Sequence, residues 1–206
     1  GLDGLPAAPS ELTPSDADIP DDAPLVLSVA RLIAQKDHAT LLRAFARVHA
    51  EHPGARLAIL GWGPLEDELR VLVRRLGLDG VVAITGRVEP RAWLERADVF
   101  AHTPQWEGFG IVLLEAMLAS LPIVATRVSA VPEIVVDGET GALAAPGDVD
   151  GVARALGGLL GLRCGGLRRP GAVTDLQCVA HAVSSSPKVG PAVRMIVSIS
   201  EKTGEK

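Results

Sequence analysis

The sequence predicts an α/β fold: a doubly wound, Rossmann-like parallel sheet with helices on both faces. Short apolar runs of strand length alternate with segments of helical period from about residue 24 to residue 160, and this alternation is typical of parallel βαβ units. The apolar runs are continuous, as expected for strands that are covered on both faces. Glycine-rich or charged loops follow the runs, whereas simple turns precede them.

Six strands are expected, each a short run rich in Leu, Val, Ile and Ala. Their ends are marked by loop residues, for example Gly61 after the second run and Gly86 after the third. In chain order, the expected strands cover residues 25–29, 56–60, 81–85, 99–102, 122–126 and 142–145.

The helices are predicted from apolar residues at helical spacing and from stop signals such as Pro53-Gly54 and Gly77. The first helix shows this spacing at Leu41, Leu42, Phe45 and Val48. In chain order, the expected helices cover residues 39–52, 65–76 and 90–97, the segment after Gly110, a short turn near Pro132, and residues 148–160.

The composition divides the chain into three parts. Residues 1–23 are rich in Pro, Asp, Ser and Ala and have no period, which predicts a linker or the remnant of a preceding segment. Residues 24–160 carry the α/β pattern and are expected to form one domain. Residues 161–206 lack a clean period, so we expect an irregular C-terminal tail.

Charge and composition exclude several functional classes. The net charge of -5 argues against nucleic acid or an anionic membrane as the main partner. The 2 cysteines form neither a disulfide framework nor a metal-binding pattern. No apolar run is long enough to span a bilayer, and the N-terminus does not resemble a signal peptide. A cytoplasmic location is therefore expected.

The loops that follow the strands are the expected ligand-binding region, because ligands of such sheets bind outside the carboxyl ends of the strands. Arg31 and Lys36 follow the first strand, where two cations can meet a phosphate or diphosphate. The alternative is that both are solvated surface charges. Lys36 is the only lysine before residue 160, which favours the first interpretation slightly.

The stretch Q-W-E-G-F-G-I-V-L-L-E-A-M-L-A-S-L, residues 105–121, holds two glutamates of interest. Glu107 lies on a glycine-rich turn, where we expect it to be more exposed than a core residue. Glu115 lies in an apolar helix, and a buried carboxylate needs a polar partner. That partner is either a structural group of the protein or a ligand. The turn 107–110 can bring backbone N–H groups and a helix N-terminus to an anion, or it is a tight turn without a ligand.

Three further side chains in these loops have no firm assignment. His102 precedes the turn and is either a base, a hydrogen-bonding partner of a sugar or, more commonly, a structural histidine. Trp62 and Trp106 can each stack on a base or sugar, or cover the core.

The ordered motifs V-A-R-L-I-A-Q-K, L-A-I-L-G-W-G-P-L, I-T-G-R-V, E-G-F-G-I-V-L-L-E-A-M and S-A-V-P-E-I-V-V-D-G-E-T-G resemble glycosyltransferase family 4. They are similar to its C-terminal, donor-binding half, which is one half of a retaining enzyme of GT-B architecture. The resemblance extends from about residue 24 to residue 160. Glu107 and Glu115 match the E-x7-E motif of that family.

The resemblance implies a role for each matching residue. Arg31 and Lys36 would bind the donor diphosphate and stabilise the leaving nucleoside diphosphate without an obligatory metal, Glu107 would contact the donor sugar, and these three would be the catalytic residues. Glu115 would accept hydrogen bonds from the ribose of a UDP- or GDP-sugar. The remaining donor-binding positions would be backbone groups that meet the base, sugar and phosphates, at Gly86, Val88, Gly108, Phe109, Gly110 and Ile111.

Three departures from the family pattern are visible. Ala30 stands where glycine is usual, immediately before Arg31, and the added methyl group is tolerable there. Ser120 stands where glycine is usual, which costs stability if the position needs a positive φ. The N-terminal acceptor domain is absent, so it is an expected partner, and the acceptor is unknown. Membrane association, if any, would come through that missing half. The alternatives to an enzyme half are a non-catalytic nucleotide-sugar-binding module and a truncated, inactive fragment.

Overall fold

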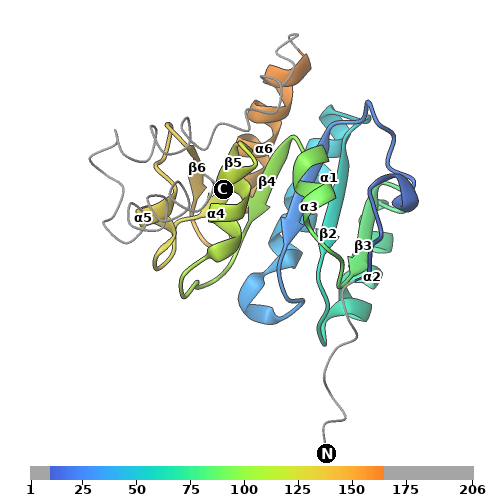
Figure 1. The fold of residues 1–206 in the computed structure, drawn as a ribbon, viewed down its shortest axis with the longest axis horizontal. Helices are drawn as coiled ribbons and strands as arrows, with labels where there is room; N and C mark the ends of the chain where they lie inside the picture. Colours follow the sequence, from blue (N-terminus) through green and yellow to red (C-terminus); the bar gives the residue numbers. More distant parts are fainter. Residues whose placement is uncertain (1–9, 165–206) are drawn as a thin grey trace, which may run out of the picture.

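A computed structural model describes residues 10–164 of the chain, which form an α/β domain around a six-stranded sheet (Figure 1). The strand order is β3-β2-β1-β4-β5-β6, and every pairing is parallel. The predicted fold class, a doubly wound parallel sheet, is therefore confirmed. The strands are β1 Leu25–Val29, β2 Arg56–Leu60, β3 Val82–Gly86, β4 Val99–His102, β5 Ile123–Thr126 and β6 Gly141–Ala144.

Helices cover both faces of the sheet (Figure 1). One face packs against α1 His38–Glu51, α2 Glu66–Arg75 and α6 Val149–Cys164. The other packs against α3 Arg91–Arg96, α4 Ile111–Leu118 and α5 Val131–Ile134. Successive side chains of a strand point to opposite faces, so Val26 of β1 joins the first core whereas Leu25 and Leu27 join the second.

The order of the strands reverses between β1 and β4. From β1 the chain proceeds outward through β2 to β3, and it then returns to the other side of β1 to form β4, β5 and β6. Sheets of this type bind ligands outside the carboxyl ends of the strands at such a point. The fold therefore directs attention to the loops after β1 and β4.

The two ends of the domain differ from the expected boundaries. Ser10 pairs with Val88 in an isolated parallel bridge, the Trp93 indole donates to the Leu12 carbonyl at 2.8 Å, and Ile19 is buried. Residues 10–23, predicted as part of a linker, thus pack against the domain. At the other end α6 continues past residue 160 to Cys164. Residues 1–9 and 165–206, including most of the predicted tail, lie outside the described residues.

The C-terminal end of α4 closes with a Schellman motif. The Ser120 N–H donates to the Met117 carbonyl at 2.8 Å, and the Leu121 N–H donates to the Ala116 carbonyl at 3.0 Å. This geometry requires a left-handed residue, usually glycine, just past the helix, and Ser120 has φ 55. The sequence predicts a loss of stability at Ser120 if this position needs a positive φ. The structure shows that it does.

Replacing Ser120 by glycine is expected to stabilise the domain. A left-handed residue with a side chain costs roughly 1–2 kcal/mol, and the greater backbone freedom of unfolded glycine offsets part of this. We expect a gain of about 1 kcal/mol, or about 2–4 °C in Tm, measured by urea and thermal unfolding. Ala119→Gly is the matched control: Ala119 has φ -79, so this variant should lose stability, and a gain there would contradict the argument.

Candidate functional site

The carboxyl edge of the sheet brings three of the predicted side chains together, namely Lys36, His102 and Glu107. The short 3-10 helix η2, Ala34–Lys36, follows β1, and the loop 103–110 follows β4. Because β1 and β4 are adjacent strands, Lys36 of the first loop meets Glu107 of the second. His102, the last residue of β4, lies beneath them.

The Glu107 carboxylate is the centre of this arrangement. Its Oε2 atom lies 2.6 Å from Lys36 Nζ and 2.7 Å from His102 Nε2, and its Oε1 atom accepts from the Gly108 N–H at 3.0 Å. Only 8% of Glu107 is exposed, so the expectation that the turn would leave it more exposed than a core residue is wrong. The reason is that its partners come from both loops and enclose it.

These contacts determine the charge of Glu107. The hydrogen bond from His102 and the contacts with Lys36 lower the pKa of Glu107 to about 2, although burial acts in the opposite direction. The carboxylate is therefore ionised throughout the neutral range, and the Lys36 ammonium compensates its charge.

Hydrogen bonds join residues 35–37 of the first loop to residues 103–107 of the second. The Gln35 side chain donates to the Trp106 carbonyl at 2.9 Å, and the Gln105 N–H donates to the Gln35 carbonyl at 2.8 Å. Asp37, which has φ 44, caps α1 by accepting from the Thr40 N–H. It also accepts from the side chain of Gln105. The loops are thus one hydrogen-bonded unit, and Lys36 lies within it.

Arg31 has a different environment from Lys36. It is exposed, and its guanidinium carbon lies 4.9 Å from the centre of the Trp62 ring, a distance typical of cation–π contact. The loop of Trp62 can approach the loop after β1 closely because Gly61 has no side chain. A Cβ at that position would lie 1.8 Å from the Ala30 carbonyl oxygen. The two predicted phosphate-binding cations therefore share one edge, but only Lys36 contacts Glu107.

Glu115 lies on the outer face of α4, one turn below its start. This face is exposed, as Ile111 (63%) and Leu118 (44%) show. The Glu115 carboxylate makes no hydrogen bond or ion pair with another residue of the described part of the chain. Partial burial, and secondarily the charge of Glu89, raises the pKa of Glu115 above its usual value. A carboxylate in this position is available to accept hydrogen bonds from a ligand.

The backbone positions predicted to meet the donor lie in two places. Gly108 and Phe109 are exposed, and Gly110, with φ 72, begins the turn into α4. Gly86, with φ 76, ends the edge strand β3, and its carbonyl accepts from the Gly61 N–H at 2.8 Å. Val88 is buried. The Gly86 carbonyl also accepts from the Thr85 hydroxyl at 3.4 Å, and the Arg87 carbonyl accepts from the Ser10 N–H at 3.0 Å.

Sequence reasoning missed several residues that shape the site. Gln35, Asp37, Gln105 and Ser129 received no role, yet the first three join the loops and Ser129 Oγ accepts from the Glu107 N–H at 3.4 Å. Their partners are distant in the sequence, so no local pattern reveals them. Trp106 is 58% exposed and therefore does not cover the core.

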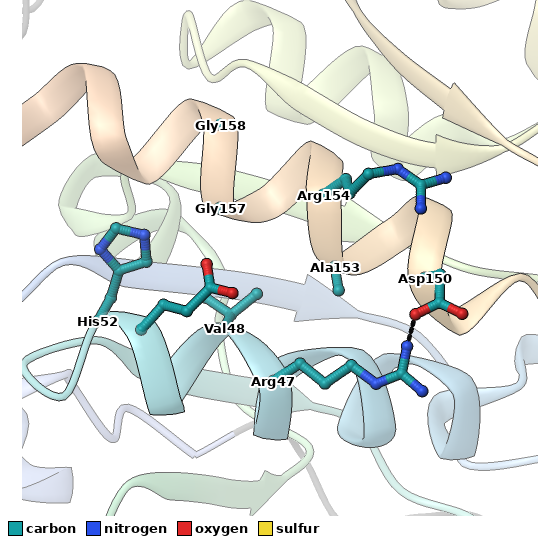
Figure 2. A pocket seen from close by; sticks show the side chains of 9 residues that line it. Arg47, Val48, His52, Asp150, Ala153, Arg154, Gly157 and Gly158 are labelled. Atoms are coloured by element: carbon teal, nitrogen blue, oxygen red, sulfur yellow. Dashed lines mark ion pairs between the residues drawn. The ribbon is translucent and has the colours of Figure 1, made fainter.

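A surface pocket of about 340 Å³ lies elsewhere, between α1 and α6 (Figure 2). Figure 2 shows Arg47 of α1 paired with Asp150 of α6 at its rim. More than half of each side chain is exposed, and the opposite charges compensate each other. Within residues 10–164, no helix is long and apolar enough to cross a membrane, and no group of three or more His, Cys, Asp or Glu side chains could hold a metal ion.

The family model of glycosyl transferases group 1 matches residues 10–164, and the chain belongs to this family. It is 37% identical over 140 residues to a lipopolysaccharide core biosynthesis glycosyltransferase of Rhizobium meliloti. It is 36% identical over 149 residues to a GDP-mannose-dependent alpha-(1-6)-phosphatidylinositol monomannoside mannosyltransferase of Mycolicibacterium smegmatis. These alignments cover 68% of this chain but only 40% and 39% of the two relatives.

Solved structures have the same fold. The C-terminal domain of a glycosyl transferase group 1 family protein from Francisella tularensis aligns with a TM-score of 0.67 and 25% identity, covering 88% of this chain and 96% of that one. A protein of Anabaena, solved in complex with UDP and glucose, aligns with a TM-score of 0.66 and 24% identity, covering 88% of this chain and 49% of that one.

The ionised Glu107 makes a specific prediction for acid stability. A lowered folded-state pKa means that the stabilisation is complete above the ordinary pKa of 4.5 and is lost as the pH falls toward 2. The effect is at most about 3 kcal/mol. Urea unfolding at pH 6, 4 and 3 should show that Glu107→Gln is less stable than the wild type at pH 6 but loses less stability on acidification. Glu133→Gln, at an exposed position, is the control. If Glu107→Gln lost as much stability on acidification as the wild type does, the lowered pKa of Glu107 would be contradicted.

Proposed function

We propose that this chain is the donor-binding, C-terminal half of a retaining glycosyltransferase of family 4, which uses a nucleotide-sugar donor. The observation that carries the proposal is the Lys36–Glu107 pair at the carboxyl ends of β1 and β4, where the strand order reverses. A second motif glutamate, Glu115, is exposed on the adjoining helix. Family membership supports it, and so does the name of the mycobacterial relative, which specifies a GDP-mannose donor.

The diphosphate would bind where positive charge is available. Lys36 Nζ contacts Glu107 through Oε2, and the flexible stem of a lysine allows the ammonium to reach a phosphate oxygen as well. Arg31, exposed and stacked on Trp62, would supply the second cation. The N–H groups at the start of α4, near Ile111, would add to the positive potential.

The two glutamates would bind the sugar and the ribose. Three of the roughly four lone-pair positions of the Glu107 carboxylate are occupied, which leaves one acceptor on Oε1 for a sugar hydroxyl. The Glu115 carboxylate keeps both oxygens for the ribose hydroxyls. The backbone of Gly86 and Val88 would meet the base, and that of Gly108, Phe109 and Gly110 would line the sugar and phosphates.

Catalysis would rest on electrostatic stabilisation of the leaving nucleoside diphosphate and on placement of the sugar. Arg31 and Lys36 would provide the positive charge, so we propose no obligatory metal. Glu107 would hold the donor sugar for transfer with retention of configuration. Each of these residues comes from a loop that the sheet and its hydrogen bonds already fix, which limits the reorganisation needed on binding.

Transfer would also require an acceptor-binding half. The chain spans about 40% of the length of the curated relatives it matches, and large apolar side chains, namely Trp106, Phe109, Ile111 and Leu118, are exposed beside the proposed donor site. We propose that an N-terminal acceptor domain faces this edge and that any association with a membrane surface of the cytoplasm comes through it. The alternative function is a non-catalytic nucleotide-sugar-binding module, which would use the same donor-binding residues.

Calorimetry against UDP-, GDP- and ADP-sugars tests the proposal. We expect heat of binding with at least one donor, with no requirement for a divalent cation, because the cations of the site are side chains. The sample should be shown to be folded by circular dichroism. Absence of binding to every donor by folded protein would contradict both the enzyme half and the binding module. Transfer to an acceptor by the isolated chain would exclude the pure binding module.

Glu115→Gln should weaken nucleotide binding while the fold survives. The amide keeps the size of the side chain but loses charge and one acceptor, and hydrogen bonds to a charged group contribute about 1.5–3 kcal/mol, so we expect roughly tenfold weaker binding or more. Glu51→Gln is the control, because Glu51 is exposed at the far end of α1. Unchanged affinity in Glu115→Gln would show that Glu115 does not bind the ribose.

A further inference from the structure

His102 is held rigidly beneath the proposed sugar site. It is the last residue of β4 and pairs with Ala125 of β5 in the interior of the sheet. Only 1% of it is exposed. Its Nε2 atom lies 2.7 Å from Glu107 Oε2, and because an ionised carboxylate only accepts hydrogen bonds, this nitrogen must carry the hydrogen. The contact is therefore a charge-assisted hydrogen bond, which is shorter and stronger than a neutral one.

The three donors to Glu107 differ in how freely they move. Gly108 is the next residue in the chain, and its N–H moves with the turn. Lys36 reaches Glu107 through a long side chain and would be shared with the donor diphosphate. His102 alone among these donors is fixed by a buried strand. When Lys36 turns toward a phosphate, His102 remains to hold the carboxylate and to satisfy Oε2.

We propose that His102 is a positioning residue, which holds Glu107 in place for the donor sugar while Lys36 serves the diphosphate. This inference rests on the proposed function. His102 would act through Glu107 and would not touch the donor. Its loss should therefore weaken recognition of the sugar and leave recognition of the nucleoside diphosphate almost unchanged.

A second buried histidine provides a matched control. His38, the first residue of α1, is 3% exposed, and neither ring nitrogen has a hydrogen-bond partner among the described residues. Burial lowers its pKa to about 4, with a smaller effect of His102, so its ring is neutral near pH 7. Replacing His38 removes a buried imidazole from the same edge without removing a hydrogen bond to Glu107.

The experiment measures binding to the full chain by calorimetry, using UDP-glucose and GDP-mannose alongside UDP and GDP. For whichever nucleotide sugar and diphosphate bind, His102→Phe should weaken the affinity for the nucleotide sugar roughly tenfold or more. It should weaken the affinity for the nucleoside diphosphate less than about twofold. His102→Gln, whose amide can donate to the same oxygen, should restore most of the affinity for the sugar form. His38→Leu should leave both affinities near the wild-type values.

A double-mutant cycle with Glu107→Gln separates positioning from general destabilisation. If His102 acts through Glu107, His102→Phe has little further effect in the Glu107→Gln background. If His102→Phe does not fold, His102→Asn, whose amide is too short to reach Glu107, replaces it. If His102→Phe weakened the affinities for the nucleotide sugar and the nucleoside diphosphate equally, or if the effects of the two substitutions were fully additive, the role of His102 would be overturned. The proposed function would not be affected by either result. Absence of any binding by the wild type would contradict the proposed function, and the inference with it.

Discussion

The buried carboxylate of Glu107 is the constraint on which the candidate site depends. A charge removed from water must be paired and hydrogen-bonded, or the fold loses several kcal/mol. Here the pairing cation comes from the loop after β1 and the buried donor from the end of β4. One carboxylate therefore joins two segments about 70 residues apart, at the point where the strand order reverses.

The sheet supplies the rigidity that this pairing needs. The side chains of β4 are fully buried, and β1 is buried at four of its five positions, between the two apolar cores. The loops that follow them start from fixed points. Hydrogen bonds of Gln35 and Gln105 then hold the loops to each other. A site built in this way is set before a ligand arrives, because its supporting residues lie on rigid elements.

The sequence predicts the scaffold better than the site. Strands 25–29, 56–60 and 99–102 match the structure residue for residue, because a strand covered on both faces is a continuous apolar run. The burial of Glu107 could not be predicted: beside Gly108 it resembles a solvated turn residue, and its partners become visible only when β1 and β4 are known to be adjacent. The packing of residues 10–23 was missed because Ile19 and Leu12 have no local period that indicates burial.

Glu107 and Glu115 lie eight positions apart but in opposite environments. Glu107 is ionised and satisfied by three donors of the protein, whereas Glu115 is exposed, without a hydrogen bond or ion pair in the described part of the chain, and has a raised pKa. A preformed cluster discriminates between ligands by geometry, because a ligand hydroxyl must fit the one acceptor position that remains on the Glu107 carboxylate. An unpartnered carboxylate instead contributes binding energy when a ligand provides the missing donors. For the proposed donor, this division would assign selectivity for the sugar to Glu107 and affinity for the nucleoside to Glu115.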